Sequence, residues 1–171
     1  MIISLMGYMG SGKSAVASRL AQDLGIRFID LDIAIEENQK KSISELFSDS
    51  GPIRFRKIEK EVLTQTLNSD IDFVLALGGG TPAYYDNLEL IKKQSQTIYL
   101  RTKISTLIKR LESQIESRPL LFHLNSDEIP EFIAKHLFER RNVYEAADFT
   151  VDTDHKTIEE ISAEIIHLLR Q

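Results

Sequence analysis

A glycine-rich segment near the N-terminus constrains the fold of this chain more than any other feature. Residues 7–14 read Gly-Tyr-Met-Gly-Ser-Gly-Lys-Ser and fit the pattern G-x-x-x-x-G-K-[ST]. An apolar stretch typical of a strand precedes the segment at residues 2–6, and an amphipathic stretch typical of a helix follows it at 14–24. This context predicts a phosphate-binding loop rather than an ordinary glycine-rich turn.

The chemistry of this segment suits the phosphate groups of a nucleotide. Glycines let several backbone N–H groups point inward at phosphate oxygens, and the helix that follows adds its positive N-terminal end. Lys13 is expected to reach the β- and γ-phosphates, and the Ser14 hydroxyl group is expected to ligate Mg²⁺. We therefore predict a nucleotide site formed by Gly10, Ser11, Gly12, Lys13, Ser14 and Ala15.

The rest of the chain alternates short apolar runs with longer amphipathic stretches. Strands are predicted at residues 2–6, 27–31, 73–77, 97–100 and 149–151, and helices at 14–24, 53–68, 104–113, 131–147 and 158–169. Capping boxes, which mark helix starts, occur at Ser42-x-x-Glu45 and Thr157-x-x-Glu160. With no linker in the chain, residues 1–171 are predicted to form one domain. Its fold is expected to be a three-layer α/β/α arrangement, with about five parallel strands between helices.

The overall composition argues against several classes of function. The formal net charge is -5, which gives no global attraction to nucleic acid or to an anionic membrane. No apolar run is long enough to span a bilayer, and there is no cysteine for disulfides, zinc or nucleophilic catalysis. These features predict a cytoplasmic protein, which we expect to be a monomer. No metal-binding spacing, and no catalytic role, is assigned to His123, His136, His155 or His167.

Unusual residues stand where two of the predicted strands end. In open parallel sheets, ligands bind beyond the carboxyl ends of the strands. A carboxylate opposite a phosphate loop can hold the water shell of Mg²⁺ or orient a hydroxyl group, and consecutive glycines let a ligand approach the backbone. A turn or a helix cap is the alternative use of such residues. The residues concerned are Asp30, Asp32, Gly78, Gly79 and Gly80.

Taken in order, these features resemble the shikimate kinase family, small-molecule kinases related to the nucleoside-monophosphate kinases. The resemblance is carried by the phosphate loop, Asp-x-Asp at 30–32, Phe-Arg-x-x-Glu at 55–59, the glycines at 78–80 and Arg-Pro-Leu-Leu at 118–121. It runs from residue 1 to about residue 151. It implies transfer of the γ-phosphoryl group of ATP to the 3-hydroxyl group of shikimate, a step towards chorismate and the aromatic amino acids. The products would be 3-phosphoshikimate and ADP.

The resemblance also implies roles for single residues. Asp30 is similar to the residue that assists Mg²⁺ through water, and Asp32 to the one that binds the shikimate hydroxyl groups, as a base or only as an orienter. Arg56 is similar to the arginine that binds the shikimate carboxylate, with Glu59 as its brace. The glycines at 78–80 resemble a loop that meets shikimate through its backbone. Arginine and carboxylate side chains suit these tasks, because arginine donates two parallel bonds and a carboxylate accepts from hydroxyl groups.

A polar stretch at residues 112–124 is predicted to be a mobile lid, because Pro119 interrupts any helix there. Arg118 within it resembles the family's lid arginine, which binds ATP by closing over its phosphates. Such an arginine would offset charge on the transferring group while the lid excludes water. The resemblance thus implies that catalysis depends on Lys13, Asp32 and Arg118.

Two further arginines are assigned by the same resemblance. The family has an arginine four residues before a tyrosine, which selects Arg140 as a second ligand of the shikimate carboxylate. Arg141 cannot face the pocket equally, because consecutive helical residues point about 100° apart. Arg110 is similar to the residue that packs on the adenine of ATP, and a solvated basic helix face is the alternative. The helices that bind shikimate would span about residues 32–69.

Other functions are compatible with a phosphate loop. A related kinase would phosphorylate gluconate or a nucleoside monophosphate, but Arg56 and Arg140 favour a carboxylate and the whole set of motifs favours shikimate. A GTPase-like switch would carry Asn-Lys-x-Asp, which is absent, and Asp-x-x-Gly where Gly78 stands. An inactive binding domain is not expected, because the catalytic residue types are all retained. The expected partners are ATP with Mg²⁺, and shikimate.

Overall fold

A five-stranded parallel sheet forms the centre of the part of the chain that the structure, a computed structural model, describes: residues 1–114, 121 and 123–171. The strand order is β2-β3-β1-β4-β5. The strands are β1 (Ile2–Met6), β2 (Arg27–Asp30), β3 (Phe73–Ala76), β4 (Gln96–Arg101) and β5 (Phe149–Asp152). All five were predicted, and the parallel pairing confirms the predicted fold class.

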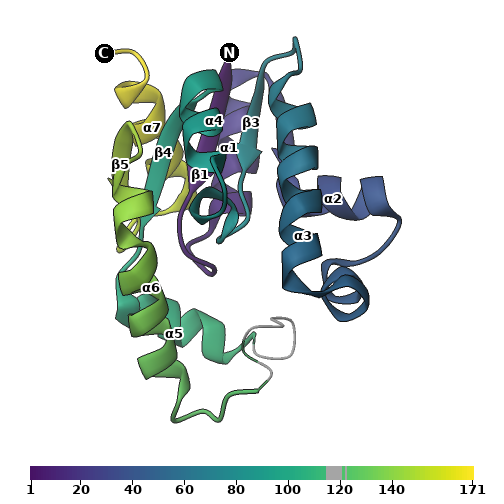
Figure 1. Ribbon diagram of the computed structural model, residues 1–171. Coiled ribbons are helices and arrows are strands. Elements are labelled where there is room, and N and C mark those ends of the chain that lie inside the picture. The colour runs from purple at the N-terminus through teal and green to yellow at the C-terminus, as the bar shows by residue number, and fades with distance from the viewer. Residues whose placement is uncertain (115–120, 122) are drawn as a thin grey trace.

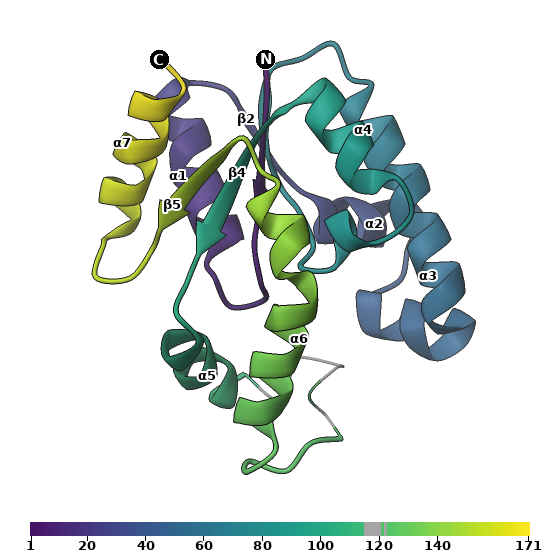
Figure 2. The same cartoon turned by 60° about the vertical axis from the view of Figure 1, so that its left-hand side comes forward.

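Helices cover both faces of this sheet (Figure 1). They are α1 (Lys13–Leu24), α2 (Leu31–Gln39), α3 (Ile43–Leu67), α4 (Asn87–Gln94), α5 (Ile104–Glu112), α6 (Ile129–Glu145) and α7 (Ile158–Leu168), with a short 3-10 helix, η1 (Thr81–Ala83). Figure 2 shows α1 and α7 on one side of the sheet and α3, α4 and α6 on the other. Among the described residues, no helix combines the length and apolarity needed to cross a membrane.

The two faces of the sheet bury two separate cores, because successive strand residues point to opposite sides. Ile3, Leu5 and Val74 pack with residues of α1 and α7 on one face. Leu75 and Tyr99 pack with residues of α2 to α6 on the other. Burial of both faces explains why the strands appear in the sequence as continuous apolar runs rather than alternating ones.

The predicted helix starts are confirmed at both capping boxes. The Ser42 side chain accepts from the backbone N–H of Glu45, whose carboxylate accepts from the N–H of Ser42, and Thr157 and Glu160 do the same at α7. α3 consists of two helical stretches that join at Gly51, whose φ of 73° and ψ of 170° are not helical. The second stretch was predicted from residue 53, and the first begins at Ile43, directly after the Ser42 capping box. The short helix α4 was not predicted, and α2 lies within the helices that the resemblance implied at about residues 32–69.

The arrangement of the strands brings three loops together. Because all strands are parallel, their carboxyl ends lie at one edge of the sheet. β1 leads into the glycine-rich loop at 7–12, β2 into α2, and β3 into residues 77–80. These segments meet at the lower edge of the sheet in Figure 1, and α5 and α6 extend beyond that edge. The predicted site residues are therefore expected to lie there.

Candidate active site

The glycine-rich loop between β1 and α1 presents donors to a concave surface. Gly12 caps α1 with φ 88°, a left-handed value that glycine adopts easily, and provides no side-chain cap for the N–H groups of the first turn. The buried Nζ of Lys13 donates to the carbonyl oxygens of Gly7 and Tyr8 at 2.9 and 3.0 Å. Backbone N–H groups and one ammonium group thus lie together, which suits the phosphate groups of a nucleotide.

A cavity of about 400 Å³ lies against this loop. The residues predicted to bind ATP all line it where the structure describes them: Gly10, Ser11, Gly12, Lys13, Ser14, Ala15 and Arg110. Nη1 of Arg110 donates to the carbonyl oxygen of Gly10 at 3.0 Å, so this side chain is tied to the loop instead of lying free on a basic helix face. Gln114, Thr153 and Lys156 also line this cavity.

Ser14 and Asp30 are joined at the edge of this cavity. The Ser14 hydroxyl group donates to Oδ2 of Asp30 at 2.5 Å. Oδ1 of Asp30 accepts from the backbone N–H groups of Asp32 and Ile33 at 3.0 and 3.4 Å and thereby caps α2. One oxygen of Asp30 thus caps a helix, which is one of the two uses that the sequence left open, and the other accepts from Ser14 of the phosphate loop.

The donor set around Ser14 and Asp30 fits a small divalent cation. A hydroxyl and a carboxylate oxygen are hard ligands, and Mg²⁺ is typically bound by one or two protein oxygens, water and phosphate. Within the residues that the structure describes, no group of three or more His, Cys, Asp or Glu side chains forms a metal cage. A cation here would therefore depend on the nucleotide for several of its ligands.

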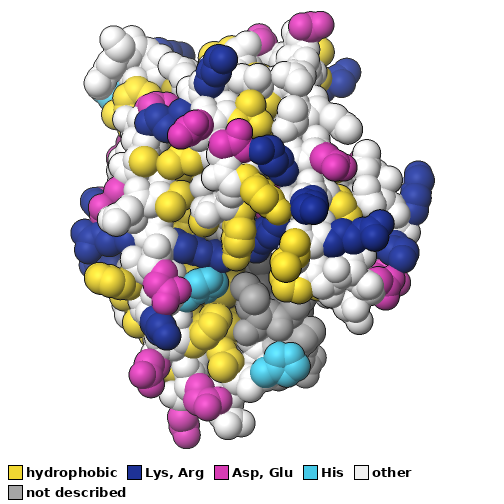
Figure 3. Space-filling view, viewed as in Figure 1, with side chains coloured by type: hydrophobic (Ala, Val, Ile, Leu, Met, Phe, Trp, Pro, Cys, Tyr) yellow, Lys and Arg dark blue, Asp and Glu magenta, His cyan; other side chains and the backbone are white. Residues whose placement is uncertain are grey.

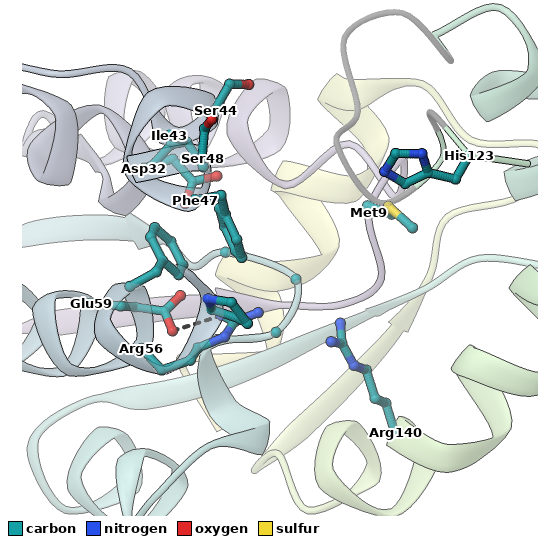
Figure 4. A pocket seen from close by; sticks show the side chains of 15 residues that line it. Met9, Asp32, Ile43, Ser44, Phe47, Ser48, Arg56, Glu59, His123 and Arg140 are labelled. Carbon is teal, nitrogen blue, oxygen red and sulfur yellow. Dashed lines mark hydrogen bonds and ion pairs between the residues drawn. The ribbon is translucent and has the colours of Figure 1, made fainter. Parts of the chain in front are cut away.

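A second cavity, of about 760 Å³, opens beside the first (Figure 4). It is lined by α3, by the glycines at 78–80 and by Arg140 of α6. Among the residues that the structure describes, four line both cavities: Met9, Asp32, Gly78 and Gly79. A molecule in the larger cavity would consequently meet the phosphate groups of a nucleotide beside Asp32.

One wall of the larger cavity is apolar. Phe47 and Phe55 stack with ring centroids 4.2 Å apart, and Ile43 and Pro52 complete this wall. The stacked rings fix the part of α3 that carries Arg56. An apolar wall opposite charged groups suits a small ring compound with polar substituents at its edge.

Arg56 is held in place by an ion pair with Glu59 and by a contact with an aromatic ring. Its Nη1 donates to Oε2 of Glu59 at 2.8 Å, and the other carboxylate oxygen of Glu59 accepts from the Thr81 hydroxyl group at 2.7 Å. The guanidinium group also lies over the ring of Tyr84, 4.0 Å from its centroid. Because the Glu59 side chain is only 1% exposed, this network fixes Arg56 firmly.

Arg140 approaches the glycines from the other side of the cavity. A Cβ atom on Gly80 would lie 2.7 Å from Nη2 of Arg56 and 3.1 Å from Nη2 of Arg140, so both guanidinium groups converge on this residue. Figure 4 shows the two side chains entering the cavity from α3 and α6. Arg141 instead points to solvent and pairs with Glu145 at 2.7 Å. Two cations this close repel each other, and a bound carboxylate would relieve the repulsion.

The positive charge of the site is local. The chain as a whole has a formal net charge of -5. Lys and Arg side chains nevertheless form a band across the middle of the face shown in Figure 3, from the region of α6 to that of α3. An anionic ligand would therefore be attracted to this face and held there by the converging arginines.

Part of the predicted lid is not described by the structure. Arg118 and Pro119 lie outside the described residues. His123, near the end of the predicted lid at 112–124, lines the larger cavity. The sequence assigned no catalytic role to His123, and no pattern in the sequence indicated its position.

Sequence reasoning missed other residues that shape the site. Met9 lies between the two cavities, and the Tyr144 hydroxyl group donates to the carbonyl oxygen of Gly79 at 2.6 Å. Tyr144 is the tyrosine of the Arg-x-x-x-Tyr pattern, so its presence was noted but its contact was not. The sequence contained a weaker signal for Phe47, because the capping box at Ser42 predicts the start of the helix on which Phe47 lies.

Comparison with known proteins gives a consistent result. A family model described as shikimate kinase matches residues 9–170. Shikimate kinase from Flavobacterium psychrophilum is 42% identical over 98% of this chain and 98% of its own length. A crystal structure of shikimate kinase from Bacteroides thetaiotaomicron has a TM-score of 0.91 at 32% identity and covers 100% of this chain and 99% of that one. Shikimate kinase from Acinetobacter baumannii, solved in complex with shikimate, has a TM-score of 0.91 at 30% identity, covering 99% and 92%.

Proposed function

This chain belongs to the shikimate kinase family, and we infer that it is an ATP-dependent kinase that phosphorylates the 3-hydroxyl group of shikimate. One observation supports this function above the others: Arg56 and Arg140 converge on Gly80 in a cavity that joins the phosphate cavity at Asp32. Shikimate carries one carboxylate and three hydroxyl groups on a small ring. The carboxylate matches the arginines, and the hydroxyl groups match the carboxylate of Asp32.

We propose that ATP binds in the smaller cavity, with its phosphates on the backbone N–H groups of residues 10–15. Lys13 would contribute positive charge at the β- and γ-phosphates, and Arg110 would pack on the adenine. Because phosphoryl transfer needs little covalent chemistry from the protein, positioning and charge stabilisation provide most of the catalysis. Arg118, which lies outside the described residues, is proposed to stabilise the transferring group.

We propose Mg²⁺ as the divalent cation of this kinase. The Ser14 hydroxyl group would bind it directly and Asp30 through water, which fits their position beside the phosphate loop. When bound, the cation would neutralise charge on the phosphate oxygens of ATP.

The acceptor side of the mechanism follows from the larger cavity. Arg56 and Arg140 would bind the carboxylate of shikimate, and the glycines at 78–80 would contact the ring through their backbone. Asp32 would orient the 3-hydroxyl group, whose oxygen attacks the γ-phosphorus atom in line with the departing ADP. The hydroxyl proton would pass to Asp32 late in the transfer, and no phosphoenzyme would form.

We also propose that residues 1–171 act as one domain, as a monomer, in the cytoplasm. The single sheet, whose two cores are shared by helices from both ends of the chain, supports the first statement. Light scattering after gel filtration would test the second.

A substrate panel tests the proposed function directly. ATP consumption is measured by coupled detection of ADP with shikimate, with gluconate and with nucleoside monophosphates as acceptors. We expect turnover with shikimate alone, because only a carboxylate acceptor with ring hydroxyl groups uses both arginines and Asp32. A Lys13→Met variant prepared in parallel controls for contaminating kinases. Activity only with a nucleoside monophosphate or with gluconate would contradict the proposal.

Substitution of Gly80 by alanine should weaken shikimate binding without unfolding the protein. Gly80 has φ -93° and ψ -16°, values that alanine adopts without strain. The added methyl group would instead displace the ends of the Arg56 and Arg140 side chains. We expect the KM for shikimate to rise about tenfold, a loss of about 1.4 kcal/mol. The KM for ATP and the Tm should hardly change, and an unchanged KM for shikimate would mean that the arginines do not bind the carboxylate at Gly80.

A further inference from the structure

Helix α6 presents three polar side chains on successive turns. His136, Arg140 and Tyr144 are spaced four residues apart, so they lie along one face of the helix. Burial raises the pKa of Tyr144 to about 12, so its hydroxyl group keeps the proton that it donates to Gly79. Arg140 lies beside Gly80, and His136 contacts Tyr8 of the phosphate loop. One helix face therefore touches both the acceptor loop and the nucleotide loop.

The contact between Tyr8 and His136 is packed and specific. The Tyr8 hydroxyl oxygen lies 2.9 Å from Nδ1 of His136, and the two rings meet edge to face at 83° with centroids 5.4 Å apart. Tyr8 is 1% exposed, and Phe132 also packs against the histidine ring, 5.1 Å between centroids. A partly buried hydrogen bond with ring packing beside it is better defined in geometry than a contact between exposed side chains.

The hydrogen bond between Tyr8 and His136 joins two uncharged groups. Burial, and then the charge of Arg140, lowers the pKa of His136 to about 4, so the ring is neutral at ordinary pH. Burial also raises the pKa of the Tyr8 hydroxyl group above its ordinary value, so Tyr8 keeps its proton. The Tyr8 hydroxyl group and Nδ1 of His136 therefore form a hydrogen bond between two uncharged groups. A neutral histidine also adds no further positive charge beside the two arginines.

Tyr8 contacts the nucleotide side of the site as well. Its carbonyl oxygen accepts from Nζ of Lys13 at 3.0 Å, while its side chain reaches α6 one turn before Arg140. A short series of contacts thus connects the lysine proposed to bind the phosphates of ATP with the arginine proposed to bind the carboxylate of shikimate.

We propose that Tyr8 and His136 are positioning residues whose hydrogen bond sets the distance between Arg140 and the phosphate loop. This inference rests on the proposed function. In this proposal Arg140 binds the carboxylate of shikimate, and the 3-hydroxyl group must reach the γ-phosphate of ATP. The distance between α6 and the phosphate loop therefore decides whether both groups of shikimate can be in place at the same time. A misplacement of about 1 Å is costly for such a geometry.

A double-mutant cycle tests this inference. Tyr8→Phe removes only the hydroxyl group, and His136→Leu removes the ring and its hydrogen-bonding nitrogen while keeping most of the volume. We expect each to raise the KM for shikimate about fivefold, the effect of one hydrogen bond of about 1 kcal/mol, and more than it changes the KM for ATP. The double variant should be no worse than either single variant, because both remove the same bond. His136→Asn, whose amide oxygen can accept from Tyr8, should restore much of the affinity.

Controls separate positioning from a general loss of structure. His167→Leu, an exposed position on α7, makes the same change of residue type and should leave the KM for shikimate unchanged. A fall in Tm with equal losses for both substrates, or additive effects in the cycle, would overturn the inference. Because the two single variants alter different elements, failure of one to fold still leaves the other to be measured.

The experiment also distinguishes failure of the inference from failure of the proposed function. If the wild type phosphorylates shikimate and Arg140→Lys raises its KM while Tyr8→Phe and His136→Leu do not, the function stands and the positioning role is wrong. If the wild type does not act on shikimate, the proposed function and the inference both fail.

Discussion

Replacing Asp32 with asparagine is expected to slow phosphoryl transfer to shikimate by about 10²- to 10⁴-fold in single-turnover measurements, the range typical of a catalytic acid or base. Asp32 lines both cavities, and one of its carboxylate oxygens lies 3.1 Å from where a Cβ atom on Gly78 would be. Asparagine keeps the shape and a hydrogen-bonding oxygen but loses the charge that would accept the hydroxyl proton. Shikimate binding should therefore change much less than the transfer rate.

Asp70→Asn provides the matched control for this experiment. Asp70 is exposed in the turn before β3, at the opposite edge of the sheet from the site, and its substitution should leave the transfer rate unchanged. Normal transfer by the Asp32→Asn variant, with intact shikimate binding, would exclude a role for Asp32 as base or orienter.

Replacing Arg56 with alanine is expected to raise the KM for shikimate at least about 30-fold, because truncating one partner of a buried charge pair costs about 2 kcal/mol or more. The same change leaves the carboxylate of Glu59 buried without its cation, since the Glu59 side chain is 1% exposed. The free energy of unfolding should therefore fall by about 3 kcal/mol. Activity and Tm must be measured on the same preparation, with assays well below the unfolding transition.

Two further variants separate the effects of charge, geometry and stability at Arg56. Arg56→Lys keeps the positive charge but loses the planar fork, so its KM for shikimate should lie between those of the wild type and Arg56→Ala. Arg54→Ala removes an exposed arginine from the same helix and should change neither the KM nor the Tm. If the KM for shikimate hardly moves in Arg56→Ala, the arginine does not bind the carboxylate.

The strands and most helix positions could be predicted because their signals are local. Both capping boxes depend on residues three positions apart, and the buried strands are short apolar runs. The helix predicted at 53–68 corresponds to the part of α3 after Gly51, because Gly51 and Pro52 interrupt the helix where the sequence indicated a boundary. Helices α2 and α4 are only nine and eight residues long, so each is too short to show a clear helical periodicity of apolar residues.

The contacts of Asp30 could be predicted only in part from the local sequence. Its position after a strand predicted either a helix cap or a role beside Mg²⁺. In the structure, one oxygen caps α2 and the other accepts from Ser14. The helix cap is thus confirmed, and the role beside Mg²⁺ stays a prediction, which the second carboxylate oxygen leaves possible because it lies beside the phosphate loop.

The sequence by itself determined the phosphate loop, because its glycines, Lys13 and Ser14 are contiguous and their chemistry needs only a strand before them and a helix after them. Only the tertiary structure decided that Arg56 and Arg140 converge on Gly80, and that Tyr8 reaches His136 across the fold. These contacts join segments that are distant in the chain. They depend on how α3 and α6 pack against the sheet, and the rotation and height of a packed helix are set by all of its buried contacts together.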